Sequence, residues 1–269
     1  MSALIHPTAL VSEKSRLGKN TTVGPFALIE DDVETGPDCR IASHAILRQG
    51  TKLGAGVQVD SFAVIAGNPQ DFSFDAKTIT GVRVGDRTVI RESVTIHRST
   101  TPGEPTTVGP DCLIMANAHI AHDCHLDHHV IVANGALLAG HVSVGAHSFL
   151  SGNTVFHQFT RIGESVMVGG GARIGYDVPH FVIAVERNEV HAINVIGLRR
   201  RGFSSEVVKD LKSVYRAVYV IPGGPKKNAA RANEQKLAQT PEGQRFLDFF
   251  LSASRGAFVR PPANKTSEG

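Results

Sequence analysis

The sequence predicts an all-β solenoid, a left-handed parallel β-helix of six-residue repeats, followed by a C-terminal helical domain. Three observations predict it: an aliphatic residue recurs at every sixth position, the fourth residue after it is usually small, and three repeats make one coil, so that residues 18 apart are stacked. The two inward positions of each repeat, one large and one small, fit the core of a narrow triangular prism. Coils of this kind usually wind left-handed, against the right-handed preference of ordinary parallel sheets.

The repeat runs in two stretches. The aliphatic positions of the first stretch are Ile5, Val11, Leu17, Val23, Ile29, Ile41, Leu47, Leu53, Val59 and Ile65, with Thr35 as the one interruption. After a slip of register, the same step continues from Val84 to Ile174, interrupted at Pro102. We therefore expect a β-helix over residues 1–195 with loops at 66–83 and 98–107, and such loops often carry function.

The period changes near residue 195. Apolar residues from Val207 to Tyr219 follow a helical spacing, the IPGGP segment at 221–225 ends that helix, and 226–238 and 241–253 predict two more. The helical domain is expected to cover residues 196–260, and residues 261–269 are expected to form a disordered tail.

Composition limits the classes of function. The net charge of +3 divides unevenly: residues 1–198 carry 14 Lys and Arg against 19 Asp and Glu, and residues 199–269 carry 14 against 6. A basic C-terminal part predicts an acidic binding partner. The alternative is that these Lys and Arg residues only solvate the exposed faces of helices. Few aromatic residues accompany the basic ones, which disfavours nucleic acid.

No targeting segment or membrane span is expected, because no apolar stretch approaches the roughly 20 residues that a membrane helix needs. A cytoplasmic protein is the resulting expectation. Cys39, Cys112 and Cys124 occupy small inward positions, so we interpret them as core residues and not as disulfides, metal ligands or nucleophiles.

Histidines gather in one stretch at outward positions. They are His119, His122, His125, His128, His129, His141, His147 and His157. Stacking by 18 places His122 below Gly140 and Gln158, and Asp123 below His141. A histidine oriented by a carboxylate is suited to act as a general base, and a glycine beside it can offer its N–H to an oxyanion. Ordinary surface histidines remain the alternative, which we retain for His125, His128 and His129.

Metal binding is a rival interpretation, since trimers of the γ-carbonic anhydrase kind hold zinc with histidines of neighbouring subunits. Zinc needs three or four converging nitrogen or sulfur ligands. The spacing of His119, His122 and His125 wraps around a coil, which disfavours such a site.

Several strings resemble the UDP-N-acetylglucosamine 3-O-acyltransferases, which catalyse the first step of lipid A synthesis. They are IRESVTIH (90–97), NAHIAHDC (117–124), LAGHVSV (138–144), HQF (157–159), VMVGG (166–170) and RRGF (200–203), and the similarity extends over about residues 1–260. The resemblance implies a homotrimer with clefts between adjacent prisms, UDP-N-acetylglucosamine as acceptor, and acyl carrier protein bearing a 3-hydroxyacyl chain as donor. It implies no metal or other cofactor.

The resemblance also implies roles for individual residues. His122 would be the general base, Asp123 its orienting partner and Gly140 the oxyanion donor. Substrate would contact Gln70, Asp71, His97, His119, His141, His157, Gln158, Asn194, Arg200 and Arg201. Gly170 would set the length of the acyl chain, because a groove ends where a side chain first blocks it. Alternatively, glycine is present at this position only because the turn requires it.

Two positions depart from the family pattern. Ser73 stands where relatives often have Lys, and Ile196 where many have Glu. Both belong to the acceptor side, so transfer to a 3-amino UDP-sugar, forming an amide, stays open. The N-acyltransferase of the same pathway is disfavoured because the repeats begin at Ile5, without the uridine-binding domain that normally precedes them. A non-enzymatic solenoid would not need a His-Asp pair stacked under a glycine.

Overall fold

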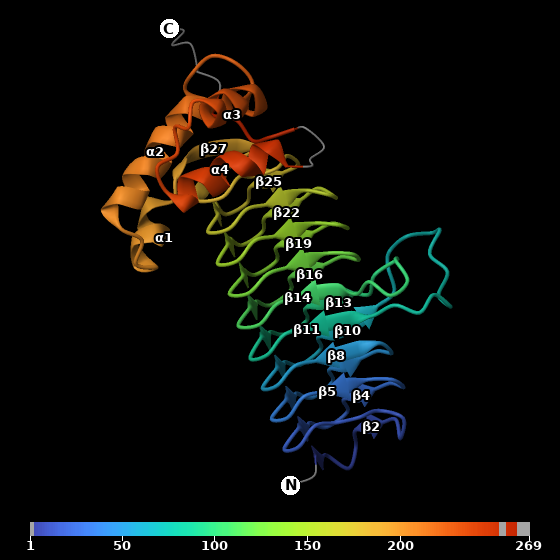
Figure 1. The fold of residues 1–269 in the computed structure, drawn as a ribbon. Coiled ribbons are helices and arrows are strands. Elements are labelled where there is room, and N and C mark those ends of the chain that lie inside the picture. The colour runs from blue at the N-terminus through green and yellow to red at the C-terminus, as the bar shows by residue number, and fades with distance from the viewer. Residues whose placement is uncertain (1–2, 253–256, 263–269) are drawn as a thin grey trace, which may run out of the picture.

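The chain is a left-handed parallel β-helix with a helical domain at its C-terminal end (Figure 1). This computed structural model describes residues 3–252 and 257–262. Short strands form three sheets, which are the sides of a triangular prism, and parallel pairing at an offset of 18 residues joins each coil to the next, as between Leu4 and Thr22. The predicted fold class is confirmed.

The strands of the three sheets are as follows, in spatial order. The first sheet contains β1 (Leu4–Ile5), β3 (Thr22–Val23), β6 (Arg40–Ile41), β9 (Gln58–Val59), β12 (Val89–Ile90), β15 (Leu113–Ile114), β18 (Ile131–Val132), β21 (Phe149–Leu150), β24 (Met167–Val168), β26 (Val182–Val185) and β27 (Glu189–Ile193). The second contains β2 (Leu10–Val11), β4 (Leu28–Ile29), β7 (Ile46–Leu47), β10 (Val64–Gly67), β13 (Thr95–His97), β16 (His119–Ile120), β19 (Leu137–Leu138), β22 (Val155–Phe156) and β25 (Arg173–Ile174). The third contains β5 (Glu34–Thr35), β8 (Thr51–Leu53), β11 (Val82–Val84), β14 (Thr106–Val108), β17 (His125–Leu126), β20 (Ser143–Val144) and β23 (Arg161–Ile162).

The core consists of the two inward positions of each repeat. Ile29, Leu47 and Ile65 stack as fully buried large residues, and small residues such as Ala45 and Ala63 fill the space between them. Close packing of this kind leaves no room for a polar side chain without a partner. The three cysteines are buried free thiols, as expected. Burial raises the pKa of Cys112 to about 11 and that of Cys124 to about 12.

Two loops leave the prism at the corner between the second and third sheets (Figure 1). Paired residues of successive coils are normally 18 positions apart in the sequence. The first loop widens this separation to 31 between Val64 and Thr95, and the second widens it to 24 between Thr95 and His119. The loops span 68–81 and 98–105 and are shorter than the expected 66–83 and 98–107, because strand pairing continues to Gly67 and resumes at Val82 and Thr106.

The helical domain contains α1 (Val195–Arg200), α2 (Ser205–Tyr219), α3 (Pro225–Glu234) and α4 (Pro241–Leu251). Hydroxyl side chains cap two of them: Ser204 accepts from the Val207 N–H, and Thr240 accepts from the Gly243 N–H. The apolar face of α2, with Leu211 and Val214, is buried. Among the described residues, no helix is long and apolar enough to cross a membrane.

Three features of this region differ from the sequence-based expectation. The β-helix ends with an antiparallel pair, β26 and β27, and helix α1 then begins at Val195, one residue before the expected boundary. Residues 257–260 are extended, with bridges from Phe258 to Asp177 and from Arg260 to Glu189, and are not helical. Of the expected helix 241–253, Ala253 lies outside the described residues, as do residues 263–269 of the expected tail.

Candidate active site

His122 and Asp123 form a hydrogen-bonded pair at the corner between β16 and β17. The His122 Nδ1 and Asp123 Oδ2 atoms are 2.6 Å apart, and the side chains are 18% and 7% exposed. An ionised carboxylate only accepts hydrogen bonds, so Nδ1 carries the proton and Nε2 is left as the basic nitrogen. This is the tautomer that a general base requires.

Asp123 is held by residues of the 98–105 loop. Its carboxylate accepts hydrogen bonds from the Ser99 hydroxyl, the Thr100 N–H and the Thr100 hydroxyl, the last at 2.7 Å. Its own N–H donates to Thr106 Oγ1 at 2.9 Å. Burial opposes ionisation of the Asp123 carboxyl, but the hydrogen bonds from Ser99, His122 and Thr100 outweigh it and hold its pKa well below the usual range. Asp123 is therefore a fixed negative charge behind His122.

Sequence reasoning identified this loop but missed Ser99 and Thr100 in it, and Thr106 at the start of β14, as residues that hold Asp123. Their hydroxyl groups in a loop beside the histidines were the available signal. The structure also shows that Arg98 joins the two loops, because its guanidinium donates to Asn68 Oδ1 and to the carbonyls of Ala76 and Thr78. Arg98 is buried, so it fixes the position of one loop relative to the other.

His141 lies on the next coil, directly beside the pair. Its Nε2 is 3.6 Å from Asp123 Oδ2, and its ring stacks on Phe159 with centroids 4.3 Å apart. The predicted vertical alignment of Asp123 and His141 is thus present. The ligand atoms of His122, Asp123 and His141 all lie within 4.8 Å of one another, a distance that would permit a metal ion. The Asp123 carboxylate already accepts hydrogen bonds from four donor groups, which hold it behind His122.

Gly140 lies against the ring of His122. A Cβ built on Gly140 would be only 2.6 Å from His122 Cε1. No described residue accepts a hydrogen bond from the Gly140 N–H. Any side chain here would displace the imidazole, and the N–H is available to an oxygen atom bound beside His122.

A cavity of about 330 Å³ opens beside the pair, with Gln70, His97, His119, His122 and Gly140 in its lining. His97 is buried, and burial together with His119 and His122 lowers its pKa to about 4. The pKa of His119 is also lowered, by burial and by His122, and its Nδ1 bonds to Thr95 Oγ1 at 2.7 Å. Both rings are therefore neutral at pH 7 and can accept or donate hydrogen bonds to a substrate.

The cavity continues along the second sheet into a groove of about 560 Å³. The two share Ala139, Val155 and Phe156, and the groove also includes His157 and Gln158. Leu137 and Val155 are 44% and 36% exposed on this face. An apolar floor with polar groups at one end suits a ligand that has a hydrocarbon chain and a polar head.

Asp71 of the 68–81 loop follows Gln70, which lines the cavity, and lies close enough to His122 to interact with it electrostatically. Its carboxylate accepts hydrogen bonds from the Ser73 N–H and hydroxyl, both at 2.8 Å. These two hydrogen bonds lower the pKa of Asp71, and the proximity of His122 contributes. Ser73 therefore orients Asp71, which the sequence comparison could not show.

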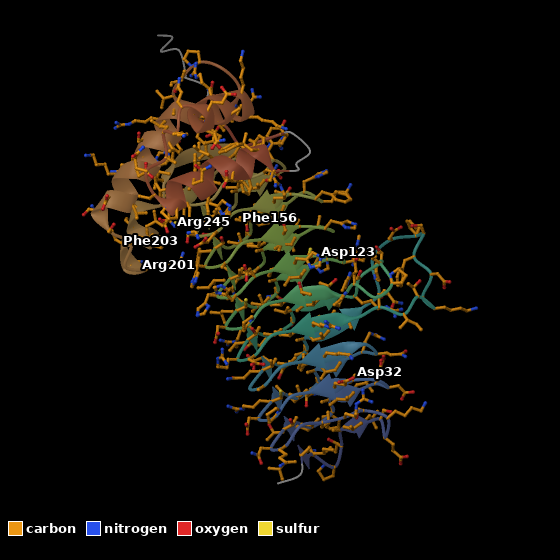
Figure 2. All side chains as sticks on the ribbon, viewed as in Figure 1. Asp32, Asp123, Phe156, Arg201, Phe203 and Arg245 are labelled. Carbon is orange, nitrogen blue, oxygen red and sulfur yellow. The ribbon has the colours of Figure 1, made fainter. Side chains whose placement is uncertain are left out.

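The remaining expected site residues lie elsewhere on the chain. Figure 2 shows Asp123 on the side of the prism that carries the loops and Arg201 below the helical domain on the opposite side. Asn194 caps α1 and donates to the Ser165 carbonyl, while Arg201 pairs with Glu164 at 3.3 Å. Arg200 is exposed near the end of the same helix. A single chain thus does not bring Asn194, Arg200 and Arg201 to His122.

Gly170 lies at the corner between β24 and β25, the opposite edge of the second sheet from Gly140. Among the described residues other than its chain neighbours, the Gly152 carbonyl oxygen is the one atom within 4 Å of a Cβ built there, at 3.7 Å. The lining of the two cavities described above does not include Gly170.

His125 lies on the third sheet, where its Nδ1 is hydrogen-bonded to Thr107 Oγ1, so His119, His122 and His125 do not converge on one metal position.

Comparison with known proteins gives consistent results. Residues 177–258 match the family described as UDP N-acetylglucosamine O-acyltransferase, domain 2, and residues 105–140 match the bacterial transferase hexapeptide repeats. The acyl-(acyl-carrier-protein)-UDP-N-acetylglucosamine O-acyltransferase of Janthinobacterium sp. (strain Marseille) is 45% identical over 262 residues, which are 96% of this chain and 100% of the relative. The enzyme of the same name from Pseudomonas paraeruginosa (strain DSM 24068 / PA7) is 45% identical over 94% of this chain and 98% of its own. The solved structure of LpxA from Acinetobacter baumannii has a TM-score of 0.91 at 30% identity, with 96% and 100% of the two chains covered.

Proposed function

The chain belongs to the family of the acyl-(acyl-carrier-protein)-UDP-N-acetylglucosamine O-acyltransferases, and we propose that His122 is the general base of the acyl transfer that begins lipid A biosynthesis. The observation that carries this proposal is the 2.6 Å hydrogen bond between His122 Nδ1 and the buried carboxylate of Asp123. In the neutral imidazole that bond places the proton on Nδ1, so the lone pair of Nε2 is directed away from Asp123.

In the proposed reaction, the 3-hydroxyl of the glucosamine attacks the thioester carbonyl of the acyl carrier protein, and His122 Nε2 takes the hydroxyl proton. The Asp123 carboxylate stabilises the imidazolium that forms. The carbonyl oxygen becomes an oxyanion, to which the Gly140 N–H donates. Collapse of this intermediate breaks the C–S bond, and the leaving thiolate receives the proton from His122. The reaction needs no metal or cofactor in this scheme.

We further propose that the polar end of the groove receives the sugar and that the apolar face receives the acyl chain. Gln70, His97 and His119 line the sugar end. Asp71 follows Gln70 on the loop, and His141 lies beside the His122–Asp123 pair. His157 and Gln158 lie farther along the groove. Leu137 and Val155 offer an apolar surface, and each methylene buried there would contribute about 0.8 kcal/mol.

A homotrimer is part of this proposal. Helix α1, with Asn194 as its N-cap and Arg200 as its last residue, and Arg201 after it lie on the far side of their own prism (Figures 1 and 2). These residues can therefore reach substrate only in the cleft of a neighbouring subunit. The excess of basic residues after position 198 offers the acidic carrier protein a docking surface. A cytoplasmic location is also proposed, consistent with three unpaired thiols in the described chain.

The test replaces His122 with Ala and compares it with His125→Ala, a histidine of the neighbouring sheet outside the cleft. Incubation with UDP-N-acetylglucosamine or its 3-amino analogue and a series of acyl carrier protein thioesters would be followed by mass spectrometry. We expect His122→Ala to lose about 10²- to 10⁴-fold in turnover and His125→Ala to keep it. Near-normal turnover of His122→Ala would refute the proposal that His122 is the general base. Preference for the amino analogue would show that the product is an amide.

A further inference from the structure

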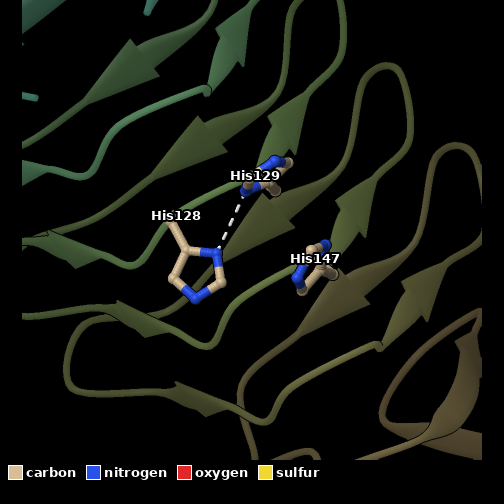
Figure 3. A group of neighbouring side chains, drawn as sticks. All are labelled: His128, His129 and His147. Atoms are coloured by element: carbon tan, nitrogen blue, oxygen red, sulfur yellow. Dashed lines mark hydrogen bonds between the residues drawn. The ribbon is translucent and has the colours of Figure 1, made fainter. Parts of the chain in front are cut away.

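Three histidines gather at a second corner of the prism, between the third and first sheets. His128 and His129 lie in the turn between β17 and β18, and His147 lies in the equivalent turn of the next coil (Figure 3). The catalytic pair lies at a different corner, between the second and third sheets. The mechanism proposed above uses none of these three residues.

The three rings face one another closely. His128 Nδ1 and His129 Nδ1 are 3.1 Å apart, as the dashed line in Figure 3 shows. The His128 and His147 ring centroids are 4.9 Å apart, and those of His129 and His147 are 4.7 Å apart. One nitrogen from each ring can be chosen so that all three lie within 4.8 Å of one another.

These distances approach those of a metal site. Two nitrogens bound to one tetrahedral Zn²⁺ at about 2.0–2.1 Å are separated by about 3.3 Å. The His128 and His129 nitrogens already have nearly this separation. A nitrogen of His147 lies within 4.8 Å of ligand atoms of both, and rotation of its side chain would have to shorten these distances to make it the third ligand. Imidazole is a preferred ligand of Zn²⁺, Cu²⁺ and Ni²⁺. We propose that His128, His129 and His147 bind one divalent transition-metal ion of this class per chain.

Backbone conformation explains only part of the cluster. His129 and His147 have φ values of 56° and 59°, and histidine is enriched among residues in this left-handed region. The same reason applies to His44, with φ 60°, whose ring stacks between Phe26 and Phe62 with no other histidine beside it. His128 has no such backbone requirement, yet its ring completes the group.

The surrounding charges permit a cation. The Asp127 carboxylate lies 3.9 Å from His128 Nε2, the ring nitrogen that an ion on Nδ1 leaves free, and adds a negative charge beside the cluster. Arg201 is a positive charge near His147, and Glu164 and Ser165 already engage it.

The test uses the full-length, metal-free protein and measures Zn²⁺ binding by calorimetry and Co²⁺ binding by its visible absorption, with Mg²⁺ as the negative probe. His147→Asn and His129→Asn keep a side chain that tolerates the left-handed backbone but remove the imidazole. His44→Asn is the matched control, and His122→Asn reports on the catalytic corner.

We expect one Zn²⁺ per chain, weakened at least about 10-fold by either cluster substitution, a loss that removal of even an outer-shell partner can cause. His44→Asn and His122→Asn should bind as the original chain does. Two results would overturn the proposal: no Zn²⁺ binding by the original chain at millimolar concentration, or loss of binding in His122→Asn with retention in His147→Asn, which would place the ion at the catalytic corner.

Discussion

Replacing Gly140 with Ala tests the geometry of the proposed base without removing any of its atoms. The new Cβ would lie 2.6 Å from His122 Cε1 and 2.8 Å from Nε2. Carbon atoms pack at about 3.5–4.0 Å, so the imidazole has to move by about 1 Å. A movement of this size would stretch the 2.6 Å bond to Asp123 beyond hydrogen-bond distance.

The expected loss follows from that displacement. A misplacement of about 1 Å at a reacting group costs about 10²-fold in rate, which is about 2.7 kcal/mol of activation free energy. Stability should change little, because the clash involves the end of a movable side chain and because Ala lowers the entropy of the unfolded chain relative to Gly. The assay measures kcat with a saturating acyl carrier protein thioester, and thermal unfolding checks the fold.

Gly224→Ala is the matched control, because no atom of another described residue, its chain neighbours aside, lies within 4 Å of a Cβ built at Gly224. It should keep activity, and its stability should fall slightly because Gly224 is the N-cap of α3, where Ala is less favourable than Gly. The reasoning is refuted if Gly140→Ala turns over within a few-fold of the original chain, since His122 would then not need its position over Gly140. Unfolding of Gly140→Ala would equally refute the premise that the imidazole gives way.

Three further predictions concern neighbouring residues. Ser99→Ala should destabilise the fold by about 1.5–3 kcal/mol at pH 7. The folded-state pKa of Asp123 is depressed, so this loss of stability should shrink as the pH falls below about 4 and the carboxylate becomes protonated. A loss that does not change with pH in urea unfolding would contradict this reasoning. His97 has a folded-state pKa of about 4, below the usual value, so its protonation favours the unfolded chain. The free energy of unfolding should therefore fall by an amount on the order of 3 kcal/mol as the pH falls from about 6.5 to 4. In urea titrations, His97→Gln should remove that part of the pH dependence. Gly170→Met should shift preference toward shorter acyl donors in a competition read by mass spectrometry, because a long side chain at this edge of the second sheet would block an acyl chain that reaches it. Unchanged preference with lower stability would assign the glycine to the turn, where a Cβ would already contact the Gly152 carbonyl oxygen at 3.7 Å.

The sequence by itself determined the fold class and the vertical order of the site. An aliphatic residue at every sixth position can bury its side chain only if the chain turns after each repeat, so the prism follows from the period alone. Stacking by 18 residues then predicts which outward side chains meet across coils. His122 beneath Gly140 and Asp123 beneath His141 are consequences of this arithmetic, and the structure has both.

Only the tertiary structure decided which groups act on these residues from outside the repeat. Ser99 and Thr100 reach Asp123 from a loop whose path no periodicity describes, and Arg98 holds that loop against the other one. The convergence of His128, His129 and His147 depends on side-chain directions at a corner. A repeat predicts where the backbone places a residue, but loop paths and rotamers are set by contacts between segments that the period does not relate.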